Sequence, residues 1–118
     1  MLITIDPEDR RPIYQQIVDE IKALIAQGVL QEGTTLAPVR QLAADLDVNL
    51  NTVATAYRVL QGEGLITVRH GSGAVITSRT TATSSQDDWR KALRTALAQM
   101  VLAGLPRTEI LQQVTAEL

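Results

Sequence analysis

Few side chains in this chain of 118 residues could carry out covalent chemistry. Cysteine is absent and His70 is the single histidine, so the sequence offers no thiolate nucleophile, no disulfide and no metal site built from several such ligands. The adjacent carboxylates Asp87 and Asp88 stand where a helix is predicted to start, which suits the helix dipole better than catalysis. We therefore expect neither an enzyme nor a cofactor or metal centre, which leaves binding functions to consider.

The total charge and its distribution point in different directions. The formal net charge is −2, and residues 1–77 hold more acids than bases, which by itself argues against a nucleic-acid partner. Most of those acids precede residue 33, however. Residues 48–79 carry Arg58, Arg69 and Arg79 against Glu63 alone, so this segment is predicted to be locally positive and to suit an anionic partner.

The sequence shows no sign of export or membrane insertion. The N-terminus has an acid by Asp6 and no basic region followed by an apolar stretch, so it does not resemble a signal peptide. The longest nearly uncharged segment, residues 92–106, contains Arg94 and is shorter than the roughly 20 apolar residues of a membrane span. A cytoplasmic protein is expected.

Three helices are predicted in the first half of the chain. Apolar residues at helical spacing predict a first helix over residues 12–27, which Gly28 ends, and a short second helix over residues 38–47. Asn49 is a good N-cap for a third helix that stops near residue 63. Two short helices joined by a tight turn form a helix-turn-helix.

A β-hairpin and a linker are predicted next. The runs 65–69 and 74–77 are β-prone, and the glycine-rich segment His70–Gly73 between them suits a hairpin turn, which would make a wing. Residues 78–86 are almost all small and polar without an apolar period. They are predicted to be a flexible linker.

Two amphipathic helices are predicted after the linker, with a break at Gly104 and Pro106. About 32 residues bury too little surface to fold alone, so these helices need a partner surface. That surface is either the first domain of the same chain or the same helices of a second copy across a two-fold axis, and the linker favours the homodimer. The apolar residues expected at that dimer interface are Trp89, Leu93, Leu97, Met100, Val101, Ile110, Leu111 and Val114.

Several short motifs occur in order along the chain. They read Pro12-Ile-Tyr-Gln-Gln-Ile17, Leu36-Ala-Pro-Val-Arg-Gln-Leu-Ala43, Val48-Asn-Leu-Asn-Thr-Val53, Ala56-Tyr-Arg-Val-Leu60, Glu63-Gly-Leu-Ile66 and His70-Gly-Ser-Gly73. Together they resemble the GntR family of bacterial winged-helix transcription factors, and within it the short YtrA-like subgroup. The resemblance covers residues 3–77 in detail, and the tail by length and helix count alone.

The resemblance implies a mostly α fold with a small β-wing. It implies a winged helix-turn-helix DNA-binding domain over residues 1–77, a linker over 78–86 and a two-helix dimerisation module over 87–118. It further implies a sequence-specific regulator, a repressor as subgroup members usually are, that binds an inverted-repeat operator as a homodimer. The recognition helix would enter the major groove, and the wing would reach the minor groove or backbone.

The residues that match the family's DNA-contacting positions, with Arg69 added as a cation beside the turn, are Arg40, Asn49, Asn51, Thr52, Arg58, Arg69, His70 and Gly71. Their chemistry agrees with that role, because a guanidinium can grip a phosphate or a guanine edge and a helix N-terminus favours phosphate. Each has a simpler explanation: Asn49 as a helix cap, Arg58 as a solvated side chain, His70 as a turn residue. The family's capping hydroxyl before the second helix is missing from Leu36-Ala37-Pro38.

Two questions about partners remain open. The same fold could serve protein contact without DNA, since fold does not fix function. A small-molecule effector of unknown identity is also a possible partner, although two short helices leave little room for a pocket of a few hundred Å³. No membrane partner is expected.

Overall fold

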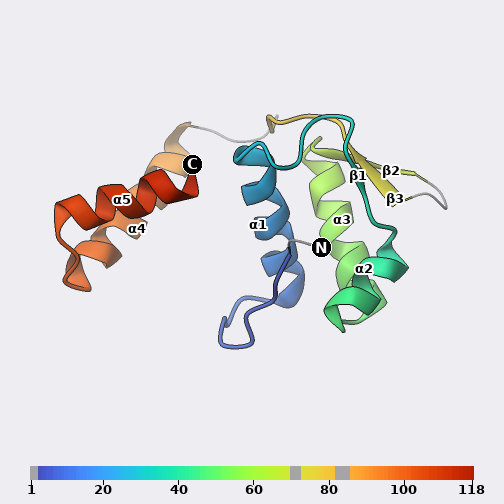
Figure 1. Cartoon of the computed structure of the whole chain (residues 1–118), viewed down its shortest axis with the longest axis horizontal. Helices are drawn as coiled ribbons and strands as arrows, with labels where there is room; N and C mark the ends of the chain where they lie inside the picture. The colour runs from blue at the N-terminus through green and yellow to red at the C-terminus, as the bar shows by residue number, and fades with distance from the viewer. Residues whose placement is uncertain (1–2, 70–72, 82–85) are drawn as a thin grey trace. The chain divides into compact units, whose positions relative to one another are not determined.

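A computed structural model describes residues 3–69, 73–81 and 86–118 of the chain (Figure 1). It divides into two compact units, Met1–Ala82 and Thr83–Leu118, and each is described by itself. Among the described residues, no helix is both long and apolar enough to cross a membrane.

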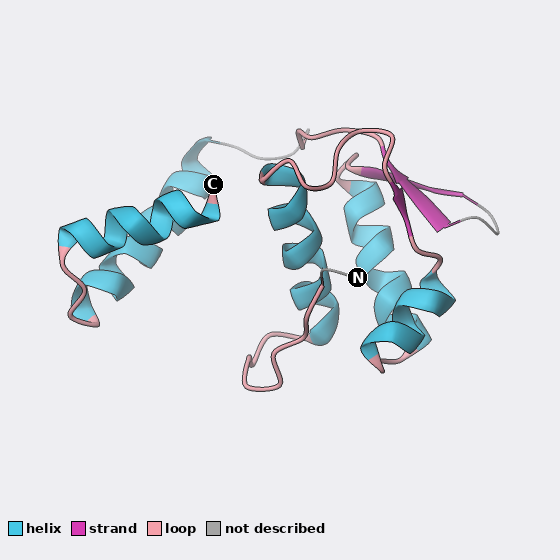
Figure 2. Ribbon diagram, in the orientation of Figure 1, coloured by secondary structure: helices cyan, strands magenta, loops and turns pink. Residues whose placement is uncertain are grey.

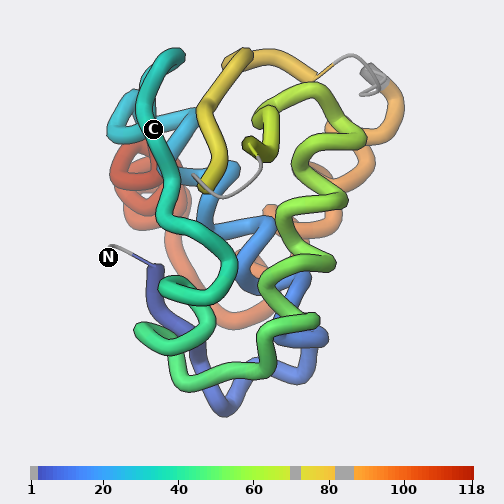
Figure 3. Tube along the Cα trace, turned by 90° about the vertical axis from the view of Figure 1, so that its right-hand side faces the viewer, coloured from blue at the N-terminus to red at the C-terminus, as the bar shows by residue number. Residues whose placement is uncertain are grey.

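Three helices build most of the first unit: α1 (Ile13–Ala26), α2 (Val39–Leu46) and α3 (Leu50–Gly62). Helix α3 packs against both α1 and α2. Figure 3 shows α2 leading through a tight turn into α3. The helix-turn-helix predicted from the sequence is confirmed, with boundaries that differ by one or two residues.

A small antiparallel sheet completes the first unit (Figure 2). Its strands are β1 (Thr35–Leu36), β2 (Ile66–Arg69) and β3 (Gly73–Ile76), in the order β1-β3-β2. The hairpin of β2 and β3 was predicted, whereas β1, which pairs Leu36 with Ala74, was not. With this wing the fold is the mostly helical winged helix-turn-helix that the resemblance implies.

The core is aliphatic, as a chain without phenylalanine requires. One face of α1 buries Ile17, Val18 and Ile21 completely, and the sheet adds Ile66 and Ile76. Burying one such side chain stabilises the fold by roughly 1.5–3 kcal/mol relative to leaving it in water. This core fixes the positions of α2, α3 and the wing.

The second unit is a helical hairpin of α4 (Gln86–Leu102) and α5 (Arg107–Glu117). The chain reverses through Gly104, whose φ of 93° is easily adopted by glycine. Ile110 is the one buried residue among the described side chains of this unit. The two helices and the break between them agree with the sequence prediction.

Candidate nucleic-acid interface

The turn between α2 and α3 sets the direction of the third helix. Asp47 takes the left-handed conformation, with φ 54° and ψ 51°, and the amide of Val48 donates to the carbonyl of Ala43 at 3.0 Å. The Asn49 side chain then caps α3 by accepting a hydrogen bond from the amide of Asn51 at 2.8 Å. The capping role predicted for Asn49 is therefore present, and the residue is exposed to solvent.

Helix α3 presents a solvent-facing stripe opposite its buried side. Val53, Ala56, Tyr57 and Leu60 are buried against the core. Asn51 and Arg58 are exposed and Ala54 is half-buried between them, at the i, i+3, i+7 spacing of one helix face. Thr55, beside this stripe, donates its hydroxyl to the carbonyl of Asn51 at 2.8 Å. An amide, a small residue and a guanidinium in this order can meet base edges and phosphates in a groove.

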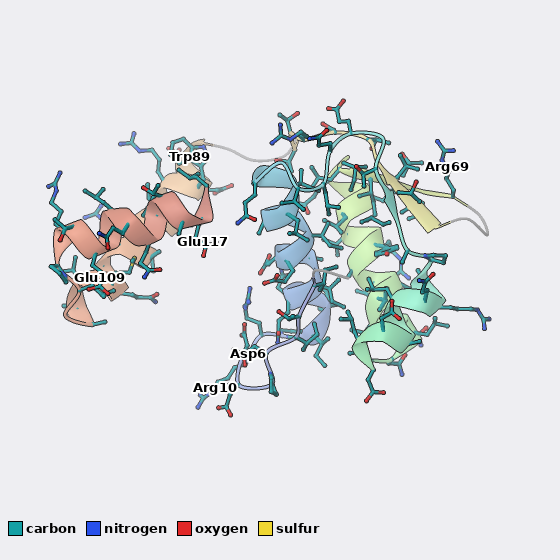
Figure 4. All side chains as sticks on the ribbon, viewed as in Figure 1. Asp6, Arg10, Arg69, Trp89, Glu109 and Glu117 are labelled. Carbon is teal, nitrogen blue, oxygen red and sulfur yellow. The ribbon has the colours of Figure 1, made fainter. Side chains whose placement is uncertain are left out.

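Arg40 lies at the start of α2, close to the wing. The N-cap of α2 is Pro38, which makes no side-chain capping bond, in agreement with the missing hydroxyl. Arg40 is exposed and shares an open depression of about 330 Å³ with Arg69, Val68 and Gly73. In Figure 4 the Arg69 side chain projects away from the end of β2. The structure thus brings two of the predicted cations to one hollow.

Asn51 and Thr52 line a different depression. Its other walls come from Thr55 and from Pro12–Tyr14 at the start of α1. The N-terminal turn of α1 therefore lies beside the first turn of α3, a proximity that the local sequence pattern does not reveal. His70 and Gly71, predicted at the wing tip, lie outside the described residues.

Two residues that the sequence prediction missed hold these elements together. The Tyr57 hydroxyl donates to the carbonyl of Ala37 at 2.6 Å, which ties α3 to the strand that precedes α2. Burial raises the pKa of Tyr57 to about 12, so the phenol keeps its proton and remains a donor at neutral pH. The Gln61 side chain accepts a hydrogen bond from the amide of Val68 at 2.8 Å and so joins α3 to the edge strand of the wing.

The positive charge is arranged differently from the prediction in one respect. Arg79 was grouped with the cations of the DNA-facing segment, but its guanidinium donates to the carbonyls of Ile25 and Ala26 at the end of α1. Local charge counting could not anticipate a partner 54 residues away. Among the residues described after residue 33 in the first unit, Arg40, Arg58 and Arg69 are the exposed cations whose side chains make neither an ion pair nor a hydrogen bond.

Two cations earlier in the chain are already engaged in ion pairs. Arg11 pairs with Asp9 and Asp19, and its hydrogen bond holds the pKa of the Asp9 carboxyl below its usual value. Lys22 of α1 pairs with Glu63 at 2.9 Å, just after α3. With Arg10, which is exposed and makes no ion pair, the three arginines named above are the cations of the described first unit that are left to attract an anion.

The segment predicted as a free linker is partly attached to the first unit. The amide of Thr77 donates to the carbonyl of Leu65 at 2.9 Å, and the Arg79 contacts follow directly. At the other end, α4 already begins at Gln86. Of the segment 78–86 predicted as a linker, Arg79 thus contacts the end of α1 and residue 86 begins α4.

The helical hairpin keeps most of its apolar side chains exposed. Trp89 and Leu93 on α4 are 52% and 49% exposed, and Leu111 and Val114 on α5 are 53% and 37% exposed. Val101 is exposed as well, whereas Leu97 and Met100 are half-buried. Ile110, also predicted at a dimer interface, is 7% exposed and belongs to the packing of its own hairpin.

The described residues contain no group of three or more His, Asp or Glu side chains that could hold a metal ion. The arrangement that they do contain is a capped third helix with an exposed polar stripe, an uncapped second helix with Arg40, and a β-hairpin. This is the architecture of the winged helix-turn-helix class, in which the third helix is the element that reads DNA.

Comparison with known proteins assigns the chain within that class. The model of the family described as "Bacterial regulatory proteins, gntR family" matches residues 13–76. The chain belongs to the GntR family, and the relatives that it matches are transcriptional regulators. The resemblance drawn from the motifs is thereby confirmed.

Individual relatives agree with this assignment. The transcriptional repressor YtrA of Bacillus subtilis is 39% identical over 82 residues, which cover 70% of this chain and 63% of the repressor. A YtrA structure from Sulfolobus acidocaldarius, a GntR-family transcription factor, has a TM-score of 0.64 at 38% identity, covering 86% of this chain and 99% of that chain. A transcriptional antiterminator from Listeria monocytogenes has a TM-score of 0.77 at 33% identity, covering 98% and 89%. The matches span only 14–29% of four longer regulators.

Proposed function

We propose that this protein is a transcriptional repressor that binds an inverted-repeat operator as a homodimer. The observation that carries the proposal is the solvent-facing stripe of α3, in which Asn51 and Arg58 are exposed and Ala54 is half-buried, on a helix whose opposite face is buried in the core. In this proposal the stripe enters the major groove of one half-site, and Arg40, Asn49 and Thr52 bind phosphates or base edges around it. The 39% identical YtrA repressor supports the direction of regulation.

The wing supplies the second contact in the proposal. Arg69 at the end of β2 is exposed, and His70 and Gly71 follow it in the sequence. A cation and a glycine at a hairpin tip suit the minor groove or the phosphate backbone. Domain boundaries follow accordingly: residues 1–77 bind DNA and residues 87–118 dimerise, in the cytoplasm where the operator lies.

The hairpin of α4 and α5 is the proposed dimerisation module. Trp89, Leu93, Leu111 and Val114 are each more than a third exposed in the isolated chain. Packing these apolar side chains against a second copy would remove their exposed surface from water. The transfer free energy of that surface would stabilise the dimer. A two-fold axis through this surface would give two recognition helices, one for each half-site.

The first test is a fluorescence-anisotropy titration with the DNA upstream of the protein's own gene and with a scrambled duplex. A specific repressor binds the first duplex tightly at near-physiological salt and the second only weakly at low salt. The variant Asn51→Ala should lose the preference, whereas Gln112→Ala, which removes an exposed amide from α5, should keep it. No binding to any duplex at low salt would instead favour protein contact.

Two further experiments test the repressor role and the choice of DNA over RNA. In transcription from the bound promoter, added protein should lower the transcript, and a rise would overturn the repressor role. Because the similar Listeria structure is titled a transcriptional antiterminator, an RNA of the operator sequence is included as competitor. Competition by RNA as strong as that by DNA would contradict a DNA operator.

A further inference from the structure

The phenol of Tyr57 joins α3 to the chain just before α2. The Tyr57 side chain is buried in the core, and its hydroxyl donates to the carbonyl of Ala37 at 2.6 Å. Ala37 lies between Leu36, the last residue of β1, and Pro38, the N-cap of α2. One hydrogen bond thus connects residues that are 20 positions apart in the sequence, at the point where α2 starts.

Helix α2 has few interactions of its own that fix where it starts. It is eight residues long, and Pro38 makes no side-chain capping bond. The amides of its first turn have no acceptor within the helix, so its first backbone bond runs from the Leu42 amide to the Pro38 carbonyl at 3.0 Å. A helix this short without a cap is marginal by itself. The position of its first turn therefore depends on contacts from outside the helix.

Tyr57 is placed to supply such a contact beside the DNA-facing residues. It lines the open depression of about 330 Å³ that Arg40 and Arg69 share. On α3 it directly precedes Arg58 of the solvent-facing stripe, and Arg40 is the third residue after Ala37. A hydrogen bond from α3 to Ala37 therefore constrains the distance between that stripe and the first turn of α2.

We propose that Tyr57 is a positioning residue whose hydroxyl holds the start of α2 at the place from which Arg40 reaches the DNA. The inference rests on the proposed DNA contacts of Arg40 and Asn51. Without the hydroxyl, the Ala37 carbonyl loses its donor and must turn towards water, and the first turn of α2 moves with it. Helix α3 keeps its own cap at Asn49 and its buried face, so Asn51 stays in place.

The test is a double-mutant cycle on operator affinity, measured by fluorescence anisotropy with the full-length protein. In the wild type, Arg40→Ala should weaken binding by about tenfold. In a Tyr57→Phe background the same change should weaken binding by less than about threefold, because Arg40 has already lost its position. Asn51→Ala should weaken binding by the same factor in both backgrounds. A general loss of folded structure would not make this distinction between the two contacts.

Tyr14→Phe is the matched control, since it removes the hydroxyl of the other tyrosine of the chain. Tyr14 is half-buried on α1, and its hydroxyl bonds to none of the described residues. In this background Arg40→Ala should keep its full effect. A tenfold effect of Arg40→Ala that persists in Tyr57→Phe overturns the inference. An effect of Asn51→Ala that shrinks in Tyr57→Phe also overturns it, because the disturbance would then extend beyond the start of α2.

Amide hydrogen exchange tests the contact without DNA. The amides of Leu42 and Val53 occupy equivalent positions, because each donates to the carbonyl of the N-cap residue of its helix. In the wild type the two should exchange at rates within about tenfold of each other, although α3 alone has a side-chain cap. In Tyr57→Phe the Leu42 amide should exchange several-fold faster and the Val53 amide at the wild-type rate. A Leu42 amide that exchanges far faster already in the wild type overturns the inference, whether or not the variant folds.

Failure of the proposed function gives a different result. If Arg40→Ala leaves the affinity of the wild type unchanged, the proposed DNA contact of Arg40 fails and the inference fails with it. If Arg40→Ala weakens the wild type and the Tyr57→Phe protein equally, the contact stands and the positioning role of Tyr57 alone is overturned.

Discussion

At the scale of single residues, the sharpest conformational demand falls on Asp47 between α2 and α3. Its φ of 54° places a residue other than glycine in the left-handed region. Aspartate tolerates this conformation better than most residues because its short side chain can bond locally, but a cost remains. The turn that orients α3 therefore holds a residue in a conformation that its type disfavours.

The variants Asp47→Gly and Asp47→Ala should separate in stability. Both remove the same charge, so they differ only in backbone preference. The alanine variant should be less stable than the glycine variant by about 1 kcal/mol, measured as the difference in free energy of unfolding in urea. Equal stabilities would show that the left-handed conformation of residue 47 is not maintained in solution.

Replacing Arg40 tests which part of the DNA the start of α2 contacts. Arg40→Ala should weaken operator binding by about 1–3 kcal/mol if the guanidinium reads a base. If it binds a phosphate, the loss should be equal for operator and scrambled DNA, and the slope of log affinity against log salt should fall by about 1. Anisotropy titrations at several salt concentrations distinguish the two, and unchanged affinity would remove Arg40 from the interface.

At the scale of elements, the sequence predicted the features that depend on neighbouring residues, such as helix caps, and missed those that depend on residues far along the chain. Asn49 was predicted as a helix cap because its side chain can reach an amide two residues along, and the 2.8 Å bond to Asn51 is there. Strand β1 was not predicted, because two residues carry no alternating pattern and the pairing of Leu36 with Ala74 depends on a segment far along the chain. For the same reason the sequence did not reveal that Arg79, counted among the positive charges of residues 48–79, bonds to the carbonyls of Ile25 and Ala26.

The wing depends on a close approach at Gly73. A Cβ built there would lie 2.4 Å from the carbonyl oxygen of Leu36 and 3.1 Å from the nitrogen of Pro38, and the φ of 83° already disfavours other residues. The β-hairpin can therefore lie against the strand before α2 only when residue 73 has no side chain. This requirement links the position of the wing to the start of the helix that carries Arg40.

Gly73→Ala should lower the free energy of unfolding by about 1–3 kcal/mol and reduce DNA affinity, because β1 must separate from β3. Gly62→Ala is the matched control. Gly62 ends α3, has no atom within 4 Å of a built Cβ, and has an ordinary φ. Its replacement should be neutral or stabilising by up to about 1 kcal/mol. Thermal unfolding of both variants checks this, and a Gly73→Ala protein as stable as wild type would contradict the close approach.

At the scale of the whole molecule, the chain combines a unit with a closed core and a hairpin that lacks one. The first unit buries side chains from α1, α3 and the sheet, whereas in the described part of the second unit Ile110 alone is buried. The sequence indicated this difference through the length of the tail. The sequence did not show that Ile110 packs inside the hairpin. An apolar residue recurs at the same helical spacing whether it packs within its own hairpin or against a second copy.

Leu93→Asp should convert the protein to a monomer. Leu93 is 49% exposed, so the charge would meet the proposed partner surface without disturbing the contact between α4 and α5. Thr95→Asp places the same charge at another exposed position of α4 and should leave the assembly intact. Sedimentation velocity of the two variants measures whether each is a monomer or a dimer. A Leu93→Asp protein that still sediments as a dimer would exclude this face of α4 as the dimer interface.

Trp89 gives the molecule a built-in optical probe. It is the single tryptophan of the chain, and it is half-exposed on α4, outside the unit that contains the helix-turn-helix. Indole emission shifts to the blue when the ring leaves water, so dilution of a dimer held by this face should move the emission maximum to the red. Unfolding of the first unit alone would leave that maximum unchanged. Intrinsic fluorescence therefore follows assembly, and circular dichroism of the same sample follows folding.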